Sequence, residues 1–265
     1  MNESKRTWSK PPLISNRAVR WTILAVVVVY AVAALASFEI DIARIIRGMD
    51  RAYEMLAAFF QPDFASRGTH IIDGVLESVA MTATATLLGL VLSVPLSFGA
   101  ASNISPMPVY LVCRSILMIV RSLHVVVLAV LFVIMLGFGP FAGAITLGLN
   151  SIGFLGKLLA EDIENSDKEP IEAVQATGGS WLQVIIYAVW PQVVTRFLGL
   201  AIYRLDINFR QSTVIGLVGA GGIGAVLDTA MGRYDYNTAG AILLVIIVIV
   251  LAGEYFSSAV RRRLT

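Results

Sequence analysis

Charged residues are scarce in this chain: Asp, Glu, Lys and Arg make up 14% of its 265 residues, whereas 57% are hydrophobic. This balance lies outside the range of soluble domains. The single cysteine, Cys113, excludes an internal disulfide, and His124 has no second His or Cys nearby, so no metal site is expected. No basic tract occurs beyond the two termini, which argues against a nucleic acid partner.

The chain also lacks the phosphate-binding loop of ATPases. Gly153–Lys157 has neither the Walker spacing nor the Ser or Thr of that motif. Gly219–Gly224 fits the pattern G-x-G-x-x-G, but a dinucleotide site requires a strand before it and a helix after it, and here it falls between two apolar runs. We therefore expect no catalytic residue and no cofactor in this chain, and ATP hydrolysis would have to come from another subunit.

What the chain has instead is long apolar runs. About 20 helical residues cross the roughly 30 Å of hydrocarbon in a bilayer. Six runs are long enough: Trp21–Phe38, Val75–Ala101, Pro108–Leu136, Phe141–Leu159, Val189–Ile215 and Thr238–Ser257. The sequence therefore predicts an all-α integral membrane protein with six transmembrane helices. We interpret the first run as a retained anchor, because it has no Ala-x-Ala-like cleavage site.

The positions of Lys and Arg predict how these helices are oriented. Six spans place both termini on one side, and both termini are basic, with five cations before Trp21 and Arg261–Arg263 at the end. That side is expected to be the cytoplasm. Arginines in the loop 39–72 alternate with acidic residues, so this loop is expected to form an external interfacial helix. The predicted order is a cytoplasmic tail 1–20, an anchor helix 21–38, the external segment 39–72, a core 73–257 and a cytoplasmic tail 258–265.

A polar stretch, residues 166–191, lies between the fourth and fifth runs and is composed like a soluble surface. Ser166 and Glu169 have the spacing of a capping box, which predicts a helix that ends at Gly178-Gly179. A second helix is expected to begin at Ser180. Four of its residues recur at helical spacing and are expected to lie along the membrane surface: Trp181, Val184, Ile185 and Ala188. The prediction is a cytoplasmic elbow of two short helices.

The first helix of this elbow presents small side chains beside polar ones, which permits the close approach of a partner. The expected contact residues are Glu172, Ala173, Gln175, Ala176, Gly178 and Gly179. On physical grounds alone an ordinary solvated loop is an equal alternative, because every polytopic protein needs loops.

The fifth run is too polar for a helix that faces lipid on all sides. Asp206 and Arg210 lie four residues apart with the acid first, a spacing that suits an ion pair. Arg204 and Asn208 have the same spacing, but Arg204 has no acidic residue at i±3 or i±4. Charges inside a membrane are costly and mostly line a cavity or pair with each other. We expect Arg204 to line an anion pathway, whereas the Asp206–Arg210 pair fits a structural role equally well.

Further polar residues occur within the apolar runs. Arg121 and His124 divide the third run, which is long enough to be kinked or broken there. Arg121 either meets a helix terminus or faces the pathway, and His124 is expected to be structural. Glu77, at the outer end of the second run, is interpreted as interfacial.

The elbow resembles a known signature. Glu172-Ala173, Gly178 and Pro191 are spaced like the cytoplasmic coupling motif EAA-x3-G-x9-I-x-L-P of permeases in binding-protein-dependent ABC importers. Three residues differ, each apolar for apolar: Val174, Ala188 and Trp190. The resemblance implies the permease fold of type I importers in a bacterial plasma membrane. It also implies a pair of ATPase subunits that receives the elbow, and an extracytoplasmic substrate-binding protein.

A longer block, Tyr203–Gly224, resembles the C-terminal signature of phosphonate-transport permeases, as do Gly139–Gly143 and Ile152–Leu158. That family usually continues with Ile-Pro-Glu where this chain has Leu123-His124-Val125. The implied substrate is a phosphonate or a related small oxyanion such as phosphite or phosphate. Arginine suits such anions, because its planar guanidinium matches tetrahedral oxygens.

The sequence therefore predicts the permease subunit of an ATP-driven importer that works by alternating access. One chain has one elbow and ABC ATPases act in pairs, so a homodimer is expected, with the pathway at the dimer interface. Its expected lining includes Arg121, Arg204, Asp206, Asn208 and Arg210. The alternatives are a permease for another solute such as methionine, a self-sufficient secondary transporter, and a membrane scaffold. Secondary transporters often show internal repeats, and we find none here.

Overall fold

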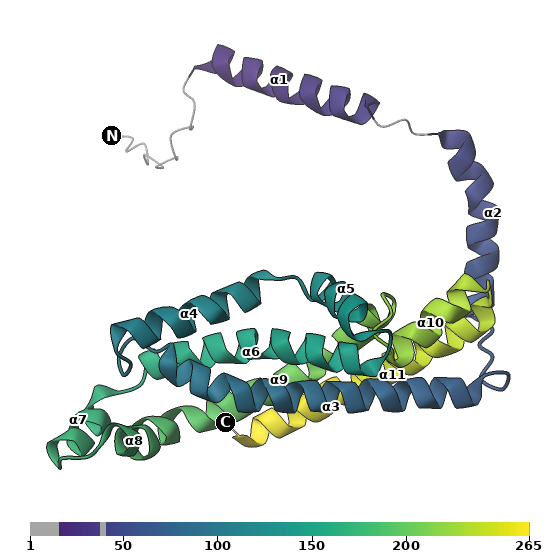
Figure 1. Ribbon diagram of the computed structural model, residues 1–265. Coiled ribbons are helices and arrows are strands. Elements are labelled where there is room, and N and C mark those ends of the chain that lie inside the picture. Colours follow the sequence, from purple (N-terminus) through teal and green to yellow (C-terminus); the bar gives the residue numbers. More distant parts are fainter. Residues whose placement is uncertain (1–15, 38–40, 265) are drawn as a thin grey trace, which may run out of the picture. The chain divides into compact units, whose positions relative to one another are not determined.

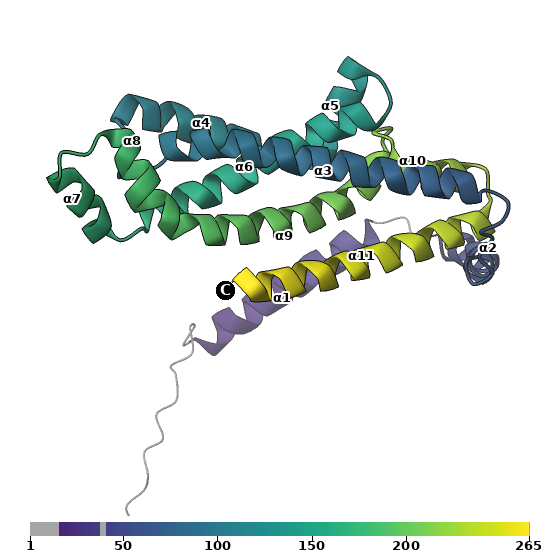
Figure 2. The same cartoon turned by 90° about the horizontal axis from the view of Figure 1, so that it is seen from below.

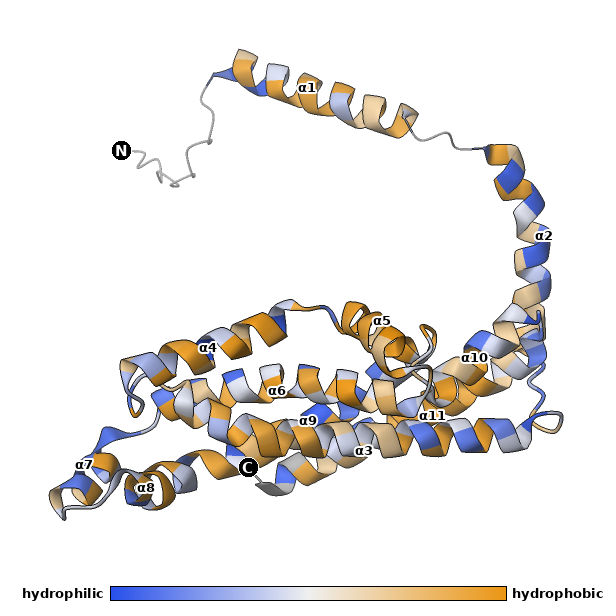
Figure 3. Ribbon diagram, in the orientation of Figure 1, coloured by the Kyte–Doolittle hydropathy of each residue, from blue (hydrophilic) through white to orange (hydrophobic). Residues whose placement is uncertain are grey.

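The computed structural model describes residues 16–37 and 41–264, and every regular element in these ranges is a helix. The chain divides into two units at Glu54. The first unit contains α1 (Arg17–Ala36) and most of α2 (Ile42–Phe59). In Figure 3 α1 is mostly hydrophobic, whereas α2 alternates between hydrophilic and hydrophobic residues. The helix expected within 39–72 is thus present and amphipathic; its place at a membrane interface stays a prediction.

The second unit is a bundle of helices (Figure 1). Its elements are α3 (Gly68–Gly99), α4 (Met107–Ser122), α5 (Val125–Leu136), α6 (Pro140–Glu164), α7 (Lys168–Ala176), α8 (Trp181–Gln183), a π-helical turn (Val184–Val189), α9 (Trp190–Gly216), α10 (Gly222–Gly232) and α11 (Tyr236–Leu264). Among the described residues, five helices are long and apolar enough to cross a membrane, and α4 with α5 makes a sixth span if the bent pair is counted as one.

The third predicted run is broken where its polar residues suggested. α4 and α5 meet at an angle of 92°. His124 occupies the break as the N-cap of α5, where its Nδ1 accepts a hydrogen bond from the backbone N–H of Val126 at 3.3 Å. The histidine satisfies one of the free N–H groups that every helix start leaves. Its predicted structural role is confirmed.

The central helix of the bundle is α6, which contacts α3 along its length and α4, α5 and α9 on its other sides. Small residues allow this close packing. A Cβ atom built on Gly89 of α3 would lie 2.4 Å from Cβ of Ser151 on α6, and one built on Gly156 would lie 2.6 Å from Leu117 of α4. Lipid provides no hydrophobic drive between helices, so close contact of small residues is what holds such bundles together.

The bundle has two different ends. At one, which we call the elbow end, the segment 166–191 joins α6 to α9 beside the loop between α3 and α4, and α11 runs back toward this end (Figures 1 and 2). At the other, the glycine-loop end, the turn Leu217–Gly221 leads from α9 into α10. The elbow and the C-terminal part of α11 therefore lie toward the same end.

A short loop after α2 is tied to the turn between α10 and α11 at the glycine-loop end. The side chain of Asn237 donates to the carbonyl of Gln61 at 2.8 Å, and Arg67 lies 3.7 Å from Asp235. Within the loop, the hydroxyl of Ser66 donates to Asp63, and this bond is the main cause of the lowered pKa of the Asp63 carboxyl. The loop therefore holds a defined shape against α11.

Candidate functional site

The first elbow helix, α7, begins one residue later than the capping pattern indicated. Its N-cap is Asp167, which makes no side-chain capping bond. The hydroxyl of Ser166 instead donates to the carbonyl of Ile163 at 2.7 Å, so it closes the end of α6. The predicted Ser166–Glu169 capping box is therefore wrong, because a nearer acceptor in the preceding helix engages the serine.

The end of α7 agrees with the sequence. Gly178 has a φ of 80°, a left-handed conformation in which a side chain is strained. Its N–H donates to the carbonyl of Gln175 at 2.9 Å, and the N–H of Gly179 donates to that of Val174 at 3.1 Å. This pair of bonds is a Schellman motif. A Cβ on Gly179 would lie 2.8 Å from the carbonyl oxygen of Val174, so both glycines are needed for the sharp turn.

Five of the six predicted coupling residues are exposed, and Gly179 is half-buried. The exposed five are Glu172, Ala173, Gln175, Ala176 and Gly178. The opposite face of α7 is held by Ile171 and Val174, which pack against a buried apolar cluster of α6, the π-helical turn and α9. α7 thus presents a surface of small and polar side chains on a firmly anchored helix.

The second elbow helix opens as predicted, because the N–H of Ser180 donates to Oε1 of Gln183 at 2.7 Å. Its apolar residues lie elsewhere than expected. Val184, Ile185 and Ala188 are buried inside the protein rather than along a membrane surface. Trp181 is half exposed, and its indole N–H donates to the carbonyl of Ile104 in the α3–α4 loop at 2.9 Å. The elbow therefore contacts the bundle through α8 as well as through α7.

The entrance and the exit of the elbow are held together. The N–H of Asp167 donates to Oε1 of Gln192 at 2.9 Å, and the Gln192 amide donates back to the carbonyl of Ala188 at 2.7 Å. Nearby, Arg196 of α9 lies 3.0 Å from Asp162 of α6. Movement of the elbow would therefore reach α6 and α9 together.

Arg204 and Asn208, predicted as pathway residues, meet in one buried polar cluster. Arg204 is 3% exposed; its Nε donates to the hydroxyl of Ser151 at 2.9 Å, and its Nη2 lies 3.4 Å from Oε1 of Gln211. The amide of Asn208 donates to Thr86 at 2.8 Å and to Ser151 at 2.9 Å. The cluster joins α3, α6 and α9, and within the described residues no carboxylate pairs with Arg204.

An aromatic ring of α6 packs against this buried cation. The guanidinium carbon of Arg204 lies 5.1 Å from the centre of the Phe154 ring, a distance at which a cation is attracted to the face of a ring. The ring of Tyr203, which is exposed, lies 6.3 Å from that of Phe154. Arg204 is therefore packed against an aromatic side chain of the neighbouring helix α6.

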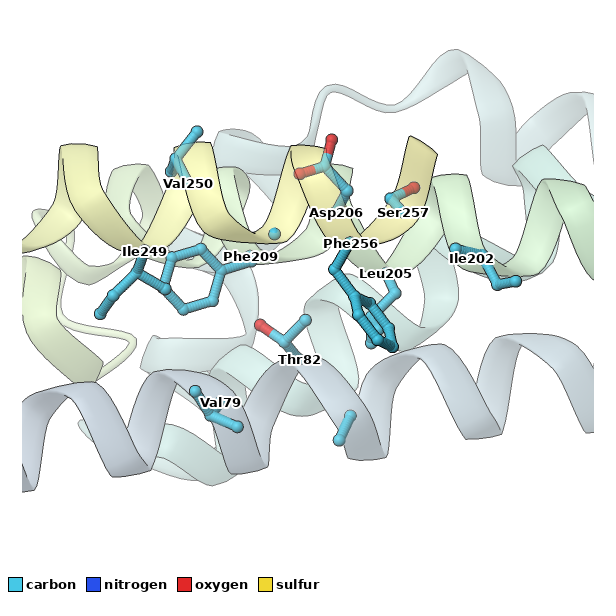
Figure 4. A pocket seen from close by; sticks show the side chains of 12 residues that line it. Val79, Thr82, Ile202, Leu205, Asp206, Phe209, Ile249, Val250, Phe256 and Ser257 are labelled. Carbon is cyan, nitrogen blue, oxygen red and sulfur yellow. The ribbon is translucent and has the colours of Figure 1, made fainter. Parts of the chain in front are cut away.

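Asp206 and Arg210 form the predicted ion pair, on another face of α9. Asp206 lines an apolar cavity of about 240 Å³ between α3, α9 and α11, shown in Figure 4. Gly253 of α11 faces the carboxylate, and a Cβ there would lie at an ordinary contact distance, 3.8 Å, from Asp206 Oδ1. The side chain of Asp206 is 9% exposed and that of Arg210 47%. This pair is thus separate from the Arg204 cluster.

Arg121 is the fifth predicted pathway residue, and it is exposed in the last turn of α4. It lines a cavity between α4 and α6 together with Lys157. The five predicted pathway residues therefore lie in three separate places. These are the buried Arg204–Asn208 cluster, the Asp206–Arg210 ion pair and the cavity beside Arg121.

The chain matches a family model described as the binding-protein-dependent transport system inner membrane component, over residues 85–265. The chain belongs to this permease family. The matched range includes the elbow, α9 and the glycine loop. The permease is therefore a multi-pass inner-membrane subunit of a transport system and not an enzyme, as predicted.

The names of several relatives state the solute that they transport. The phosphate-import permease protein PhnE of Mycolicibacterium smegmatis is 36% identical over 252 residues, which cover 95% of this chain and 47% of that protein, so the chain spans about half of its length. The phosphite transport system permease protein PtxC of Stutzerimonas stutzeri is 37% identical over 241 residues, 89% of this chain and 87% of that protein. A probable D-methionine permease, MetI of Vibrio cholerae, is 25% identical over 215 residues, 76% of this chain and 94% of that protein.

The predicted fold is confirmed by a solved structure. The permease resembles a chain of the inward-facing MetNI methionine ABC transporter with a TM-score of 0.65, covering 76% of this chain and 99% of that one at 21% identity. At this identity the likeness concerns the fold alone.

Sequence reasoning missed how the glycine loop of the permease is held. Glu77, interpreted as interfacial, accepts a hydrogen bond from the N–H of Gly222 at 3.0 Å, and Ser78 accepts one from Ile223 at 2.9 Å. Both residues of α3 thereby cap the start of α10. A carboxylate at that position also complements the positive end of the helix dipole. No local pattern indicates this contact, because 145 residues separate its partners.

Proposed function

We propose that this permease is the membrane-spanning subunit of an ATP-driven importer for phosphonates or a related small oxyanion such as phosphite or phosphate. The observation that carries the substrate class is Arg204, a buried cation in a spanning helix with only neutral partners among the described residues. Such a charge is costly in a membrane interior unless an anion or water meets it. Relatives named for phosphate and phosphite support the same class.

The elbow is the proposed contact with a pair of ATPase subunits, which supply the energy. Its exposed face permits close approach, and Glu172 offers a carboxylate to a cation of the partner. In this proposal the elbow end and both termini are cytoplasmic. A substrate-binding protein docks at the opposite end, near Gly216–Tyr236, and a second copy of the chain completes the pathway at the interface between the copies.

Transport would follow from movement of the elbow. ATP closes the ATPase pair and shifts α7 and α8, and the bonds of Gln192 and Trp181 pass this shift to α9 and to the α3–α4 loop. The ring of Phe154 lies against Arg204 in this structure, so the anion would meet Arg204 in a second conformation. Alternating access requires such a conformation, and hydrolysis would return the subunits to the first one.

The choice of substrate is tested by uptake into vesicles that contain the permease with its partner ATPase and binding protein. We expect ATP-driven uptake of at least one of phosphite, phosphate and methylphosphonate, and none of D-methionine. Each solute is offered with a radioactive label, and vesicles without ATP serve as the control. Uptake of methionine together with no uptake of any of the three anions would contradict the proposal.

A further inference from the structure

A second group of cations lies apart from Arg204, around a cavity of about 380 Å³ between α4 and α6. α4 contributes Arg114 and Arg121, and α6 contributes Lys157 and Glu161. Lys157 ends the Gly153–Lys157 stretch that fails as a Walker motif, so the proposed function gives it no role. The cavity is open at the surface of the bundle, and Leu117, Met118 and Ser122 of α4 complete its lining.

The charges around this cavity do not balance. Arg114 lies 3.6 Å from Glu164, and Lys157 lies 3.3 Å from Glu161. Arg121 has no carboxylate within ion-pair distance in the described parts of the chain. The three cations and the two carboxylates, those of Glu161 and Glu164, thus give this region one surplus positive charge. The Lys157–Glu161 pair is more than a third exposed on both side chains, so it is weak and its ammonium is available to another anion.

Arg121 lies beside the middle of a helix that is long enough to cross a bilayer. A Cβ built on Gly153 would lie 3.2 Å from the backbone nitrogen of Arg121, and Gly153 lies halfway along α6. α6 is one of the helices long enough to cross a bilayer. An unpaired cation at this depth is costly against lipid, and such residues mostly face a cavity that admits water or ions.

We propose that the cavity of Arg121 and Lys157 is a second anion subsite on the transport path, which takes a tetrahedral oxyanion. The inference rests on the proposed function. The planar guanidinium of Arg121 offers paired N–H donors, and the ammonium of Lys157 adds a charge that leaves Glu161 for the anion. Lys157 lies one helical turn beyond Phe154 toward the elbow end, so the subsite receives the anion after it leaves Arg204 and before it reaches the cytoplasm.

The test uses the complete complex of permease, ATPase and binding protein in vesicles. The variants are Arg121→Gln, Lys157→Gln and the two together, with Arg262→Gln, an exposed cation of α11, as the matched control. We expect the double variant to lower the maximal uptake rate of phosphite about tenfold, because a hydrogen bond to a charged group contributes about that factor. The half-saturating concentration stays unchanged, since the binding protein captures the anion. Arg121→Lys, which keeps the charge but loses the paired donors, is expected to retain part of the rate that Arg121→Gln loses.

Two lipid compositions separate a transported anion from a lipid headgroup of the same chemistry. In vesicles of phosphatidylcholine alone and in vesicles that also contain phosphatidylglycerol, we expect the same loss. A loss confined to the anionic vesicles would overturn the inference in favour of a headgroup, and a double variant with the wild-type rate would overturn it outright. A wild type that transports none of the three anions would contradict the proposed function instead.

A second measurement applies if the double variant does not assemble. Lys157 in the wild-type complex is then labelled with an amine-reactive acetylating reagent, and its modification is followed by mass spectrometry. Saturating phosphite is expected to slow the labelling of Lys157 but not that of Lys168, which is exposed on α7. Equal rates with and without phosphite would overturn the subsite.

Discussion

Replacing Gly178 with proline is expected to abolish ATP-driven uptake while the chain still inserts into the membrane. The φ of Gly178 is 80°, whereas the ring of proline holds φ at about −65°. Proline also has no N–H to donate to the carbonyl of Gln175. α7 would then lose its Schellman turn, and its exposed face would no longer be presented next to α8. Uptake of phosphite is measured in vesicles with the partner subunits.

Two further variants separate this effect from simple misfolding. Gly178→Asn is expected to keep most of the activity, because asparagine tolerates the left-handed conformation. Glu172→Lys changes an exposed side chain and leaves the backbone intact, and it is expected to abolish uptake by reversing the charge that meets the ATPase. Normal uptake by Gly178→Pro and Glu172→Lys, in chains shown to be inserted and dimeric, would refute the coupling role of the elbow.

Replacing Arg204 with methionine is expected to lower uptake about a hundredfold without lowering the thermal stability of the chain. Arg204 is buried among neutral groups, so its charge gives little or no net stabilisation to the fold. Replacing a buried ion pair with apolar side chains of similar size is often neutral or stabilising, by up to about 4 kcal/mol, and Arg204 lacks even the attraction of a partner carboxylate among the described residues. Uptake depends on the same charge because the anion has to meet it. The two measurements are the uptake rate and the melting temperature in detergent.

Arg196→Met provides the contrast in the same helix. Arg196 lies 3.0 Å from Asp162, whose side chain is 8% exposed, so its loss leaves a poorly solvated carboxylate without a partner. We expect a lower melting temperature, with a loss of about 1–3 kcal/mol in the free energy of unfolding. If Arg204→Met lowers the melting temperature as much as Arg196→Met does, Arg204 is structural and the anion contact is wrong.

The sequence predicted the features that depend on near neighbours along the chain. The six apolar runs, the break beside His124, the Asp206–Arg210 pair and the turn at Gly178-Gly179 all follow from hydropathy or from spacings of a few residues. The capping box at Ser166 was wrong for a related reason: the pattern fits, but the end of α6 offers the serine hydroxyl a nearer acceptor. A local motif does not show which of two local partners is engaged.

Other features depend on contacts between distant helices. Hydropathy assigned Val184, Ile185 and Ala188 to a membrane surface, because a protein core and a lipid surface favour the same apolar side chains. The hydrogen bond from Gly222 to Glu77 and the joining of Arg204 to Ser151 have no signal in either local sequence. The charge surplus around Arg121 also appears only when α4 is placed against α6.

The most direct test of the account is the energy source of uptake. Vesicles that contain the permease alone are compared with vesicles that also contain the ATPase, each with the loaded binding protein outside and with or without ATP inside. The account predicts uptake of the oxyanion only when the ATPase and ATP are both present, and its loss with Glu172→Lys. Uptake that persists in vesicles without the ATPase would identify a self-sufficient transporter and contradict the account.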